Sequence, residues 1–305
     1  MSIYTDLAME ARELHPGLTG VTEQREEREG IVISRIRITG PSAAEKLGKR
    51  MGNYVTIDAP ELAERPPELI ERTAGVLASE LRRMLGNEKD NMTVLTVGLG
   101  NRAVTPDSLG PRTAERVFVT RHIKAQFPDA FDHPAVSSAS LAPGVLGTTG
   151  IETSDLVKGV CERIRPDAVI VVDSLASRRA ARISTTIQLS DAGIDPGSGV
   201  GNIRAGLNSD ILGIPVIAVG VPLVVKASTI IRDAIASIAD RAGIRGAEEK
   251  LEALAESAAE SELDGLIVTP KDIDTIVSDM SGLLAEGINH ALFGEYHDEI
   301  MTLLT

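Results

Sequence analysis

The sequence predicts an α/β fold with a mostly parallel, doubly wound sheet and a β-rich N-terminal portion. From residue 91 onward, short aliphatic strands alternate with glycine-rich loops and helical stretches, an order typical of doubly wound sheets. Before residue 91, β-branched residues alternate with polar ones in two runs bounded by Gly and Pro. With 305 residues, 43% of them hydrophobic, the chain can bury a sizeable core. We expect a single α/β domain over residues 1–305, with N-terminal strands and a helix in 1–90 and the core in 91–305.

In the N-terminal portion, the charged run Glu23–Glu29 predicts a solvated helix or loop because its signs are mixed. The alternating patterns of Ile31–Ile38 and Gly52–Asp58 predict strands. A helix is expected over Glu68–Leu85, where apolar residues recur at helical spacing, and Gly86 should end it.

In the core, aliphatic runs predict three strands and a weaker fourth, and the stretches between them predict helices. The expected strands are Thr93–Val97, Ala168–Val172, Val216–Val219 and, weaker, Gly265–Thr269. The expected helices are Arg112–Ile123, Ser154–Arg165, Ser228–Arg241, an exposed acidic helix over Gly246–Glu262, and one from about Asp272.

Composition excludes several classes of function. There are 31 Lys plus Arg and 44 Asp plus Glu, a net charge of 31 − 44 = −13, which disfavours direct nucleic acid binding. The single cysteine, Cys161, cannot form an internal disulfide, and the N-terminus lacks the blocks of a signal peptide. No apolar run approaches the ~20 residues that span a bilayer. We therefore expect a cytoplasmic protein without a membrane anchor.

Two aspartates stand where an open parallel sheet binds ligands, beyond the carboxyl ends of its strands. Asp107 lies in the loop Gly98–Pro111 that follows the first core strand, and Asp173 directly follows the aliphatic run Ala168–Val172. Carboxylates that share a cleft repel, so one keeps its proton and can act as general acid while the other acts as base towards water. The alternatives are a helix N-cap for Asp107 and a structural hydrogen bond for Asp173.

Glycine-rich loops beside these acids allow a ligand or peptide to approach the backbone closely. The candidate substrate-binding residues are Gly98, Gly100 and Asn101 in the first loop, and Gly199 and Gly201 in the loop Ser190–Asn202. A substrate role for Glu152 is secondary, because Thr153 or Ser154 reads first as a helix N-cap.

Other catalytic signatures are missing or incomplete. Residues 98–103 match the spacing of a dinucleotide fingerprint, but Pro106 and Pro111 interrupt the helix that the motif needs, so no nicotinamide cofactor is expected. There is no Walker loop, Gly-x-Ser-x-Gly elbow or His-Glu-x-x-His pair. The histidines have no obvious metal-ligand spacing apart from a wide pair, His122 and His133; the others are His15, His290 and His297.

Five segments, in order along most of the chain, resemble the bacterial spore germination protease family. They are Thr5–Glu13, Val97–Pro111, Leu141–Asp155, Val171–Ala176 and Gly213–Pro222. The resemblance implies an endopeptidase that cleaves the small acid-soluble proteins coating spore DNA, and hence a location in the spore core. The family's proposed catalytic pair is two aspartates, in a Thr-Pro-Asp and a Val-Val-Asp loop, which fall on Asp107 and Asp173.

The resemblance also implies a homotetramer and a three-layer αβα, phosphorylase/hydrolase-like fold shared with hydrogenase maturation endopeptidases. Those relatives use a metal whose third ligand is a histidine, which no motif here supplies, so a mechanism without metal or other cofactor is favoured. Two alternatives stay open: a metal-dependent maturation endopeptidase on the same scaffold, and a non-proteolytic, phosphorylase-like binding protein with phosphate near Gly197–Gly201.

Two features depart from the family pattern. The family is made as a zymogen whose N-terminal propeptide is removed by self-processing, whereas only four residues precede Thr5-Asp6 here. We therefore expect either a very short propeptide or a start near the mature N-terminus. After Pro222, Lys226 stands where an acidic residue is expected, which leaves any role of that acid unassigned.

Overall fold

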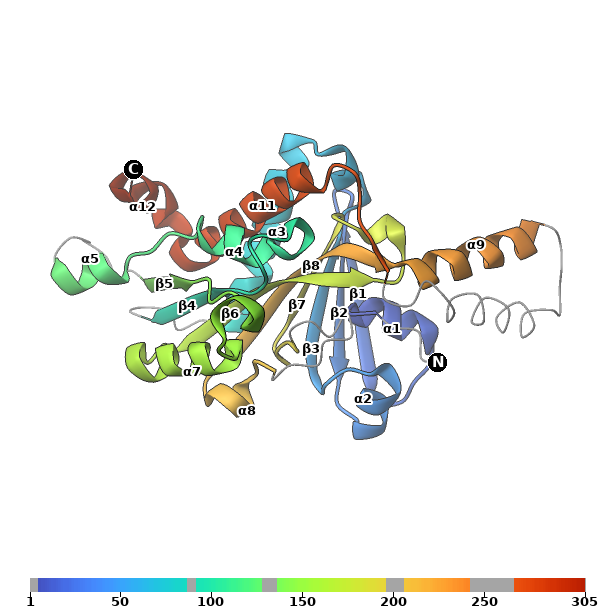
Figure 1. Cartoon of the computed structure of the whole chain (residues 1–305), viewed down its shortest axis with the longest axis horizontal. Coiled ribbons are helices and arrows are strands. Elements are labelled where there is room, and N and C mark those ends of the chain that lie inside the picture. Colours follow the sequence, from blue (N-terminus) through green and yellow to red (C-terminus); the bar gives the residue numbers. More distant parts are fainter. Residues whose placement is uncertain (1–4, 87–91, 128–135, 196–205, 242–265, 305) are drawn as a thin grey trace.

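The computed structural model describes residues 5–86, 92–127, 136–195, 206–241 and 266–304 (Figure 1). Its centre is a nine-stranded mixed sheet with the strand order β1-β2-β3-β7-β8-β6-β4-β5, and β9 pairs with β8 off this path. The N-terminal strands and the core strands therefore belong to one continuous sheet.

Four strands form the parallel part of the sheet: β4 (Thr93–Gly98), β5 (Ser137–Leu141), β6 (Ala168–Ser177) and β8 (Val216–Lys226). The antiparallel part contains β1 (Val21–Arg28), β2 (Ile31–Ile38), β3 (Gly52–Asp58), β7 (Thr186–Ser190) and the short β9 (Ile267–Val268). The predicted α/β class with a β-rich N-terminal portion is confirmed.

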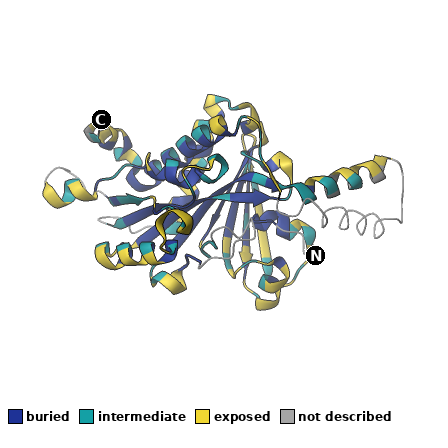
Figure 2. Cartoon of the chain, viewed as in Figure 1, coloured by how far each residue is buried: buried dark blue, intermediate teal, exposed yellow. Residues whose placement is uncertain are grey.

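Helices cover both faces of the sheet and give three layers (Figures 1 and 2). One face carries α3 (Pro67–Leu85), α4 (Leu109–Ala114) and α11 (Ile273–Phe293); the other carries α1 (Ala8–Leu14), α2 (Pro41–Leu47) and α7 (Thr153–Ile164). The remaining helices are α5 (Arg121–Gln126), α6 (Leu146–Thr149), α8 (Ser209–Leu212), α9 (Ala227–Arg241) and α12 (His297–Leu304).

The core lies on both sides of the central strands. In β6, Ile170 and Val172 pack into the cluster under α3 and α11, whereas Val169 and Val171 pack into the cluster under α7. Burial on both faces explains why this strand is aliphatic at successive positions instead of alternating with polar residues.

Most predicted elements are found within a few residues, but two predictions are wrong. The run Glu23–Glu29 is mostly exposed, as expected, yet all of it except Glu29, which lies in the following turn, belongs to the strand β1. Pairing with β2 satisfies its backbone, and its charges suit an edge strand because they discourage pairing with another chain.

The predicted helix Arg112–Ile123 is also wrong, because two short helices, α4 and α5, replace it. Between them the chain forms tertiary hydrogen bonds instead of helical ones: the Phe118 amide donates to Asn289 Oδ1, and the Thr120 amide donates to the Ser138 carbonyl. The segment is thereby held against α11 and β5.

Strands β5 and β7 were not predicted, and β8 continues through Gly220 and Pro222 to Lys226, where it pairs with β9. The predicted helix over 246–262 lies outside the described residues. Within the described residues, none of the helices combines the length and apolar character needed to cross a membrane.

Candidate active site

Asp173 lies inside strand β6, at the level where the neighbouring parallel strand β4 ends. Val172 is opposite Gly98, the last residue of β4, and Asp173 is opposite Gly220 of β8. The Asp173 side chain is only 6% exposed, and its Oδ1 accepts the amide proton of Ser174 at 2.8 Å. The predicted position of Asp173 at the end of its own strand is wrong, because β6 continues to Ser177 and pairs with β8 over that length. Asp173 lies instead one residue beyond the level at which β4 ends.

The loop after β4 turns tightly because it packs backbone against backbone. The Leu99 amide donates to the Val172 carbonyl at 2.8 Å. A Cβ on Gly98 would lie 2.1 Å from the Gly110 carbonyl oxygen, and a Cβ on Gly110 would lie 2.5 Å from that of Val172. Glycine at these positions lets the start of α4 sit directly on the end of β4 and on the middle of β6, at Val172.

Asp107 is held by this loop. Gly100 has φ +115°, and a Cβ there would lie 2.0 Å from the Asp107 carbonyl oxygen, so a side chain is excluded. The Asn101 amide donates to Asp107 Oδ2 at 2.8 Å. Asp107 ends a short 3₁₀ turn, Thr105–Asp107, and Ser108 stands at the N-cap of α4. The helix-cap alternative for Asp107 is therefore not what the structure shows.

The surroundings of Asp173 raise its pKa to about 8. Burial is the largest cause, and the nearby charges of Asp107 and Asp6 act in the same direction, whereas the Ser174 amide opposes them. Asp173 therefore keeps its proton near neutral pH. A protonated carboxyl beside a second carboxylate is the arrangement needed for paired acid and base catalysis.

Asp6 is a third acid beside this pair that sequence reasoning missed. The Asp6 amide donates to the Ala176 carbonyl at 3.0 Å, and the Ala176 amide donates to Asp6 Oδ2 at 2.8 Å, so the N-terminal segment pairs with β6 just beyond Asp173. Gln188 of β7 brackets the segment, donating to the Asp6 carbonyl at 2.9 Å and accepting from the Ala8 amide at 2.6 Å. The segment around Thr5-Asp6 carried the family resemblance, but nothing in its pattern placed it beside Asp173.

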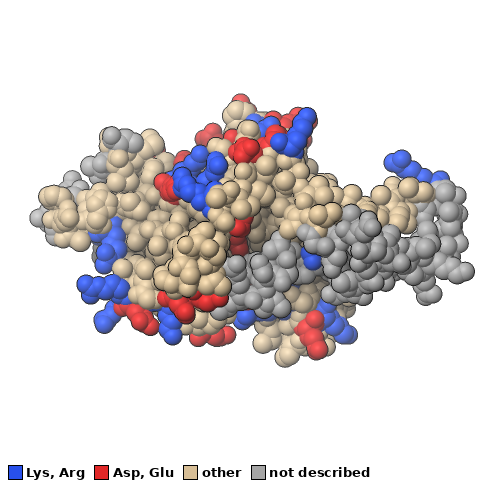
Figure 3. Space-filling view, in the orientation of Figure 1, with Lys and Arg blue, Asp and Glu red and all other residues tan. Residues whose placement is uncertain are grey.

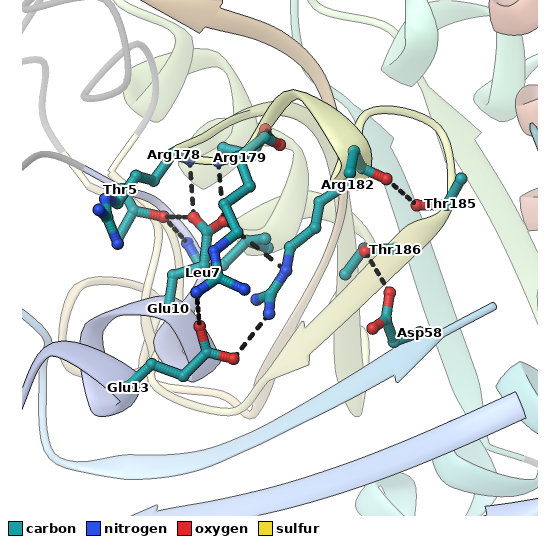
Figure 4. A network of polar contacts seen from close by, with 12 residues as sticks. Thr5, Leu7, Glu10, Glu13, Asp58, Arg178, Arg179, Arg182, Thr185 and Thr186 are labelled. Carbon is teal, nitrogen blue, oxygen red and sulfur yellow. Dashed lines mark hydrogen bonds and ion pairs between the residues drawn. The ribbon is translucent and has the colours of Figure 1, made fainter. Parts of the chain in front are cut away.

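A buried carboxylate on α1 fixes this N-terminal segment (Figure 4). Glu10, 1% exposed, accepts the amide protons of Arg178 at 2.7 Å and Arg179 at 3.0 Å, and also the Thr5 hydroxyl proton. Arg182 approaches Glu10 at 3.7 Å and forms an ion pair with Glu13 at 2.7 Å. The loop after β6 is thereby tied to α1.

The other predicted substrate-binding residues are less informative. Glu152 is half-buried and stands at the N-cap of α7, where its side chain forms no capping hydrogen bond, and its charge is not among the causes of the Asp173 shift. Gly199 and Gly201 lie outside the described residues. Gly98, Gly100 and Asn101 belong to the same loop as Asp107.

Within the described part of the chain, the three-residue group placed to share a metal ion is Glu286, His290 and His297. It lies at the far end of α11 and contains neither aspartate. On the face shown in Figure 3, acidic and basic side chains are interspersed without a continuous basic surface.

Comparison with known proteins shows close relatives. The germination protease family matches residues 2–263. The germination protease of Caldanaerobacter subterraneus subsp. tengcongensis is 44% identical, covering 96% of this chain and 94% of its own. That of Clostridium acetobutylicum is 39% identical over 95% of both chains, and that of Bacillus pumilus is 38% identical over 95% of this chain and 93% of its own.

Among solved structures, a NiFe hydrogenase maturation protease from Thermococcus kodakarensis is 15% identical and aligns with a TM-score of 0.35, covering 68% of this chain and 98% of its own. A likeness of this strength carries no inference about mechanism.

Proposed function

Because the chain belongs to the germination protease family, and is therefore a protease, we propose that it cleaves small acid-soluble spore proteins by using Asp107 and Asp173 to activate water. The observation that carries the mechanism is the pair itself. Asp173 is buried with its pKa raised to about 8, partly by the charge of Asp107.

In the proposed reaction, Asp107 takes a proton from a water molecule as the water oxygen attacks the peptide carbonyl carbon. Asp173 donates its proton to the leaving nitrogen, and the C–N bond breaks. The proton gained by Asp107 then returns to Asp173, which resets the pair. Backbone amides of the glycine loops would stabilise the oxyanion in this reaction. Gly98 and Gly100 shape the first of these loops, because a Cβ at either position would meet the backbone of Gly110 or Asp107. The Asn101 amide instead orients Asp107.

Several further features of the proposal rest on the family. A homotetramer, synthesis as a zymogen and a location in the spore core are expected of a germination protease. The position of Asp6 supports the zymogen element, because the backbone around Asp6 is hydrogen-bonded to β6 three residues beyond Asp173. The protein's own N-terminal segment thus lies within reach of the proposed catalytic pair.

The test is to incubate the purified protein with a small acid-soluble spore protein and determine the masses of the fragments. We expect discrete fragments from the wild type and none from Asp107→Asn or Asp173→Asn. The matched control is Asp167→Asn, the same substitution at the opposite end of β6. Asp167 is exposed there and accepts the Thr93 amide proton, a bond that asparagine can keep. Full cleavage by Asp173→Asn overturns the mechanism, whereas cleavage of other proteins but not of the spore protein overturns only the substrate.

A chelator distinguishes this mechanism from metal-dependent hydrolysis at the same loops. The wild type should retain its activity in the chelator. The comparison is best repeated in a His290→Ala background, so that any metal held at the far end of α11 does not contribute. Loss of activity in both backgrounds, restored by a divalent metal, would favour the metal-dependent alternative.

A further inference from the structure

The junction of α11 and α12 brings together one glutamate and two histidines that the protease chemistry does not use. Glu286 and His290 are four residues apart on α11, so they lie on the same face of the helix. His297 opens α12 and folds back onto them across the short turn Gly294–Tyr296. Glu286 Oε1 is 3.1 Å from His290 Nε2 and 3.5 Å from His297 Nε2.

These separations match those between the ligands of a small tetrahedral ion. Zn²⁺ binds histidine nitrogen and carboxylate oxygen at about 2.0–2.2 Å, which places neighbouring ligand atoms about 3.3 Å apart in a tetrahedron. The potential ligand atoms of the three side chains all lie within 4.8 Å of one another.

His297 is fixed in the orientation that such an ion needs. The ring is 5% exposed and packs against Phe118, with centroids 5.3 Å apart. Its Nδ1 is 3.0 Å from Asp298 Oδ1, and because an ionised carboxylate only accepts, Nδ1 carries the hydrogen. In the neutral ring, Nε2 then presents its lone pair towards Glu286. This Nε2 is buried and has no hydrogen-bond partner among the described residues.

We propose that Glu286, His290 and His297 bind a divalent transition-metal ion, for which Zn²⁺ is the best match, with Asp298 orienting His297. The two imidazoles are borderline ligands that suit Zn²⁺ better than Mg²⁺ or Ca²⁺, and carboxylate oxygen is also a ligand in zinc sites. A carboxylate that holds the second nitrogen of a ligating histidine is a common partner in zinc sites.

The entry path lies on the solvent side. Glu286 and His290 are 45% and 40% exposed, so an ion can reach them and keep a water molecule as fourth ligand. The rings of His290 and His297 are stacked, with centroids 3.9 Å apart and planes at 18°. The exposed His290 ring turns to direct Nε2 at the ion, while the buried His297 ring stays in place.

The site is structural and not catalytic. Thr105, beside Asp107, donates to Asp274 in the first turn of α11 at 3.0 Å, and Glu286 is twelve residues further along the helix. That separation is about 18 Å along the helix axis. A metal here ties α12 to the end of α11 and leaves the aspartates untouched.

The test is calorimetric titration of the chelator-stripped full chain with Zn²⁺, followed by Co²⁺ as a spectroscopic probe of tetrahedral nitrogen and oxygen ligation. We expect one strongly bound Zn²⁺ per chain. His290→Ala, at a half-buried position where truncation should leave the chain folded, should weaken binding by at least ~10-fold, and Asp298→Asn should weaken it by about 10-fold. The matched control is His122→Ala, which removes another exposed histidine, on α5, and should leave the affinity unchanged.

A second readout does not depend on the affinity. Zn²⁺ should raise the Tm of the wild type and slow hydrogen exchange in α12, and it should do neither in His290→Ala. If the wild type does not bind Zn²⁺, Glu286, His290 and His297 form only an ion-pair cluster. Equal Zn²⁺ affinity in the wild type and His290→Ala would place the metal elsewhere. Either result overturns the proposal, and neither bears on peptide hydrolysis.

Discussion

Two buried carboxylates, Glu10 of α1 and Asp173 of β6, differ in what surrounds them. Glu10 is 1% exposed and is met by two backbone amides, a hydroxyl and the guanidinium of Arg182. Asp173 is 6% exposed and receives one amide, while the charges nearest to it are carboxylates. The two acids are buried to a similar extent, but only Asp173 is left in an environment that disfavours its charge.

Under the proposed mechanism, this difference separates a structural acid, Glu10, from a catalytic one, Asp173. A buried carboxylate that is fully hydrogen-bonded holds elements together, since removing it leaves donors unpaired. A buried carboxylate without cationic partners costs stability in its charged form, and such a cost is characteristic of catalytic sites. Glu10 should therefore matter for folding, and Asp173 for turnover.

The largest expected effect is that of Asp173→Asn on catalysis. Because asparagine cannot donate the proton to the leaving nitrogen, kcat should fall on the order of 10⁴-fold, as for removal of a member of other catalytic constellations. The fold should be unaffected, because asparagine is isosteric and avoids a buried charge. Peptidase assays and thermal melts of the same preparations measure both quantities. A fall of less than about 10-fold would place Asp173 with the structural acids.

Glu10→Ala should have the opposite effect, a large loss of stability with little change in kcat. It leaves the Arg178 and Arg179 amides without their acceptor and removes one of the two carboxylates beside Arg182, which should cost about 3 kcal/mol of unfolding free energy. Urea denaturation measures this loss. The folded fraction should keep a kcat within about a few-fold of the wild type. The matched control is Glu13→Ala, which removes an exposed partner of Arg182 and should cost less than about 1 kcal/mol.

The same contrast explains how much the sequence could predict. The aliphatic run before Asp173 and the glycines after Val97 singled out both aspartates as candidates from the local pattern, although the strand itself continues past Asp173 to Ser177. The fold class followed from the alternation of aliphatic strands, glycine-rich loops and helices along the chain. Strand β1 was missed because its charges suggest solvent, whereas its hydrogen bonds come from pairing with β2, from Arg28 opposite Ile31 to Val21 opposite Ile38. Such pairing is not encoded in the local pattern.

Long-range contacts also account for the missed site residues. Asp6 lies near Asp173 only because the N-terminal segment pairs with β6, as in the bond from the Ala176 amide to Asp6, which spans 170 residues of sequence. Likewise, Glu286 and His290 have a recognisable helical spacing, but His297 joins them only through the turn between α11 and α12. Local spacing shows which side chains share a helix face; it does not show what folds against that face.

A smaller effect is expected on the pH dependence of stability. The pKa of Asp173 is about 8 in the folded protein and about 3.8 as a free side chain. Between these values the folded state binds more protons than the unfolded state, so stability falls as pH rises and the loss is complete above about pH 8. Between about pH 5 and about pH 8 the wild type should lose on the order of 2 kcal/mol relative to Asp173→Asn, because a buried site relaxes when it ionises. Urea titrations of both proteins at these two pH values measure the difference. If the unfolding free energies of the two proteins change equally between these pH values, Asp173 is already ionised at neutral pH.

The smallest effect tests the third acid. Asp6 contributes least to the raised pKa of Asp173, after burial and Asp107. In Asp6→Asn the amide oxygen can still accept the Ala176 amide proton, so the N-terminal segment should stay in place while its charge is lost. The pKa of Asp173 should then fall by less than about one unit, and the alkaline limb of the kcat profile should move to lower pH by the same amount. If the alkaline limb stays in place, burial and the charge of Asp107 alone account for the raised pKa of Asp173. If the alkaline limb moves to higher pH, the charge of Asp6 does not raise the pKa of Asp173, because removing a nearby negative charge can only make a carboxyl easier to ionise.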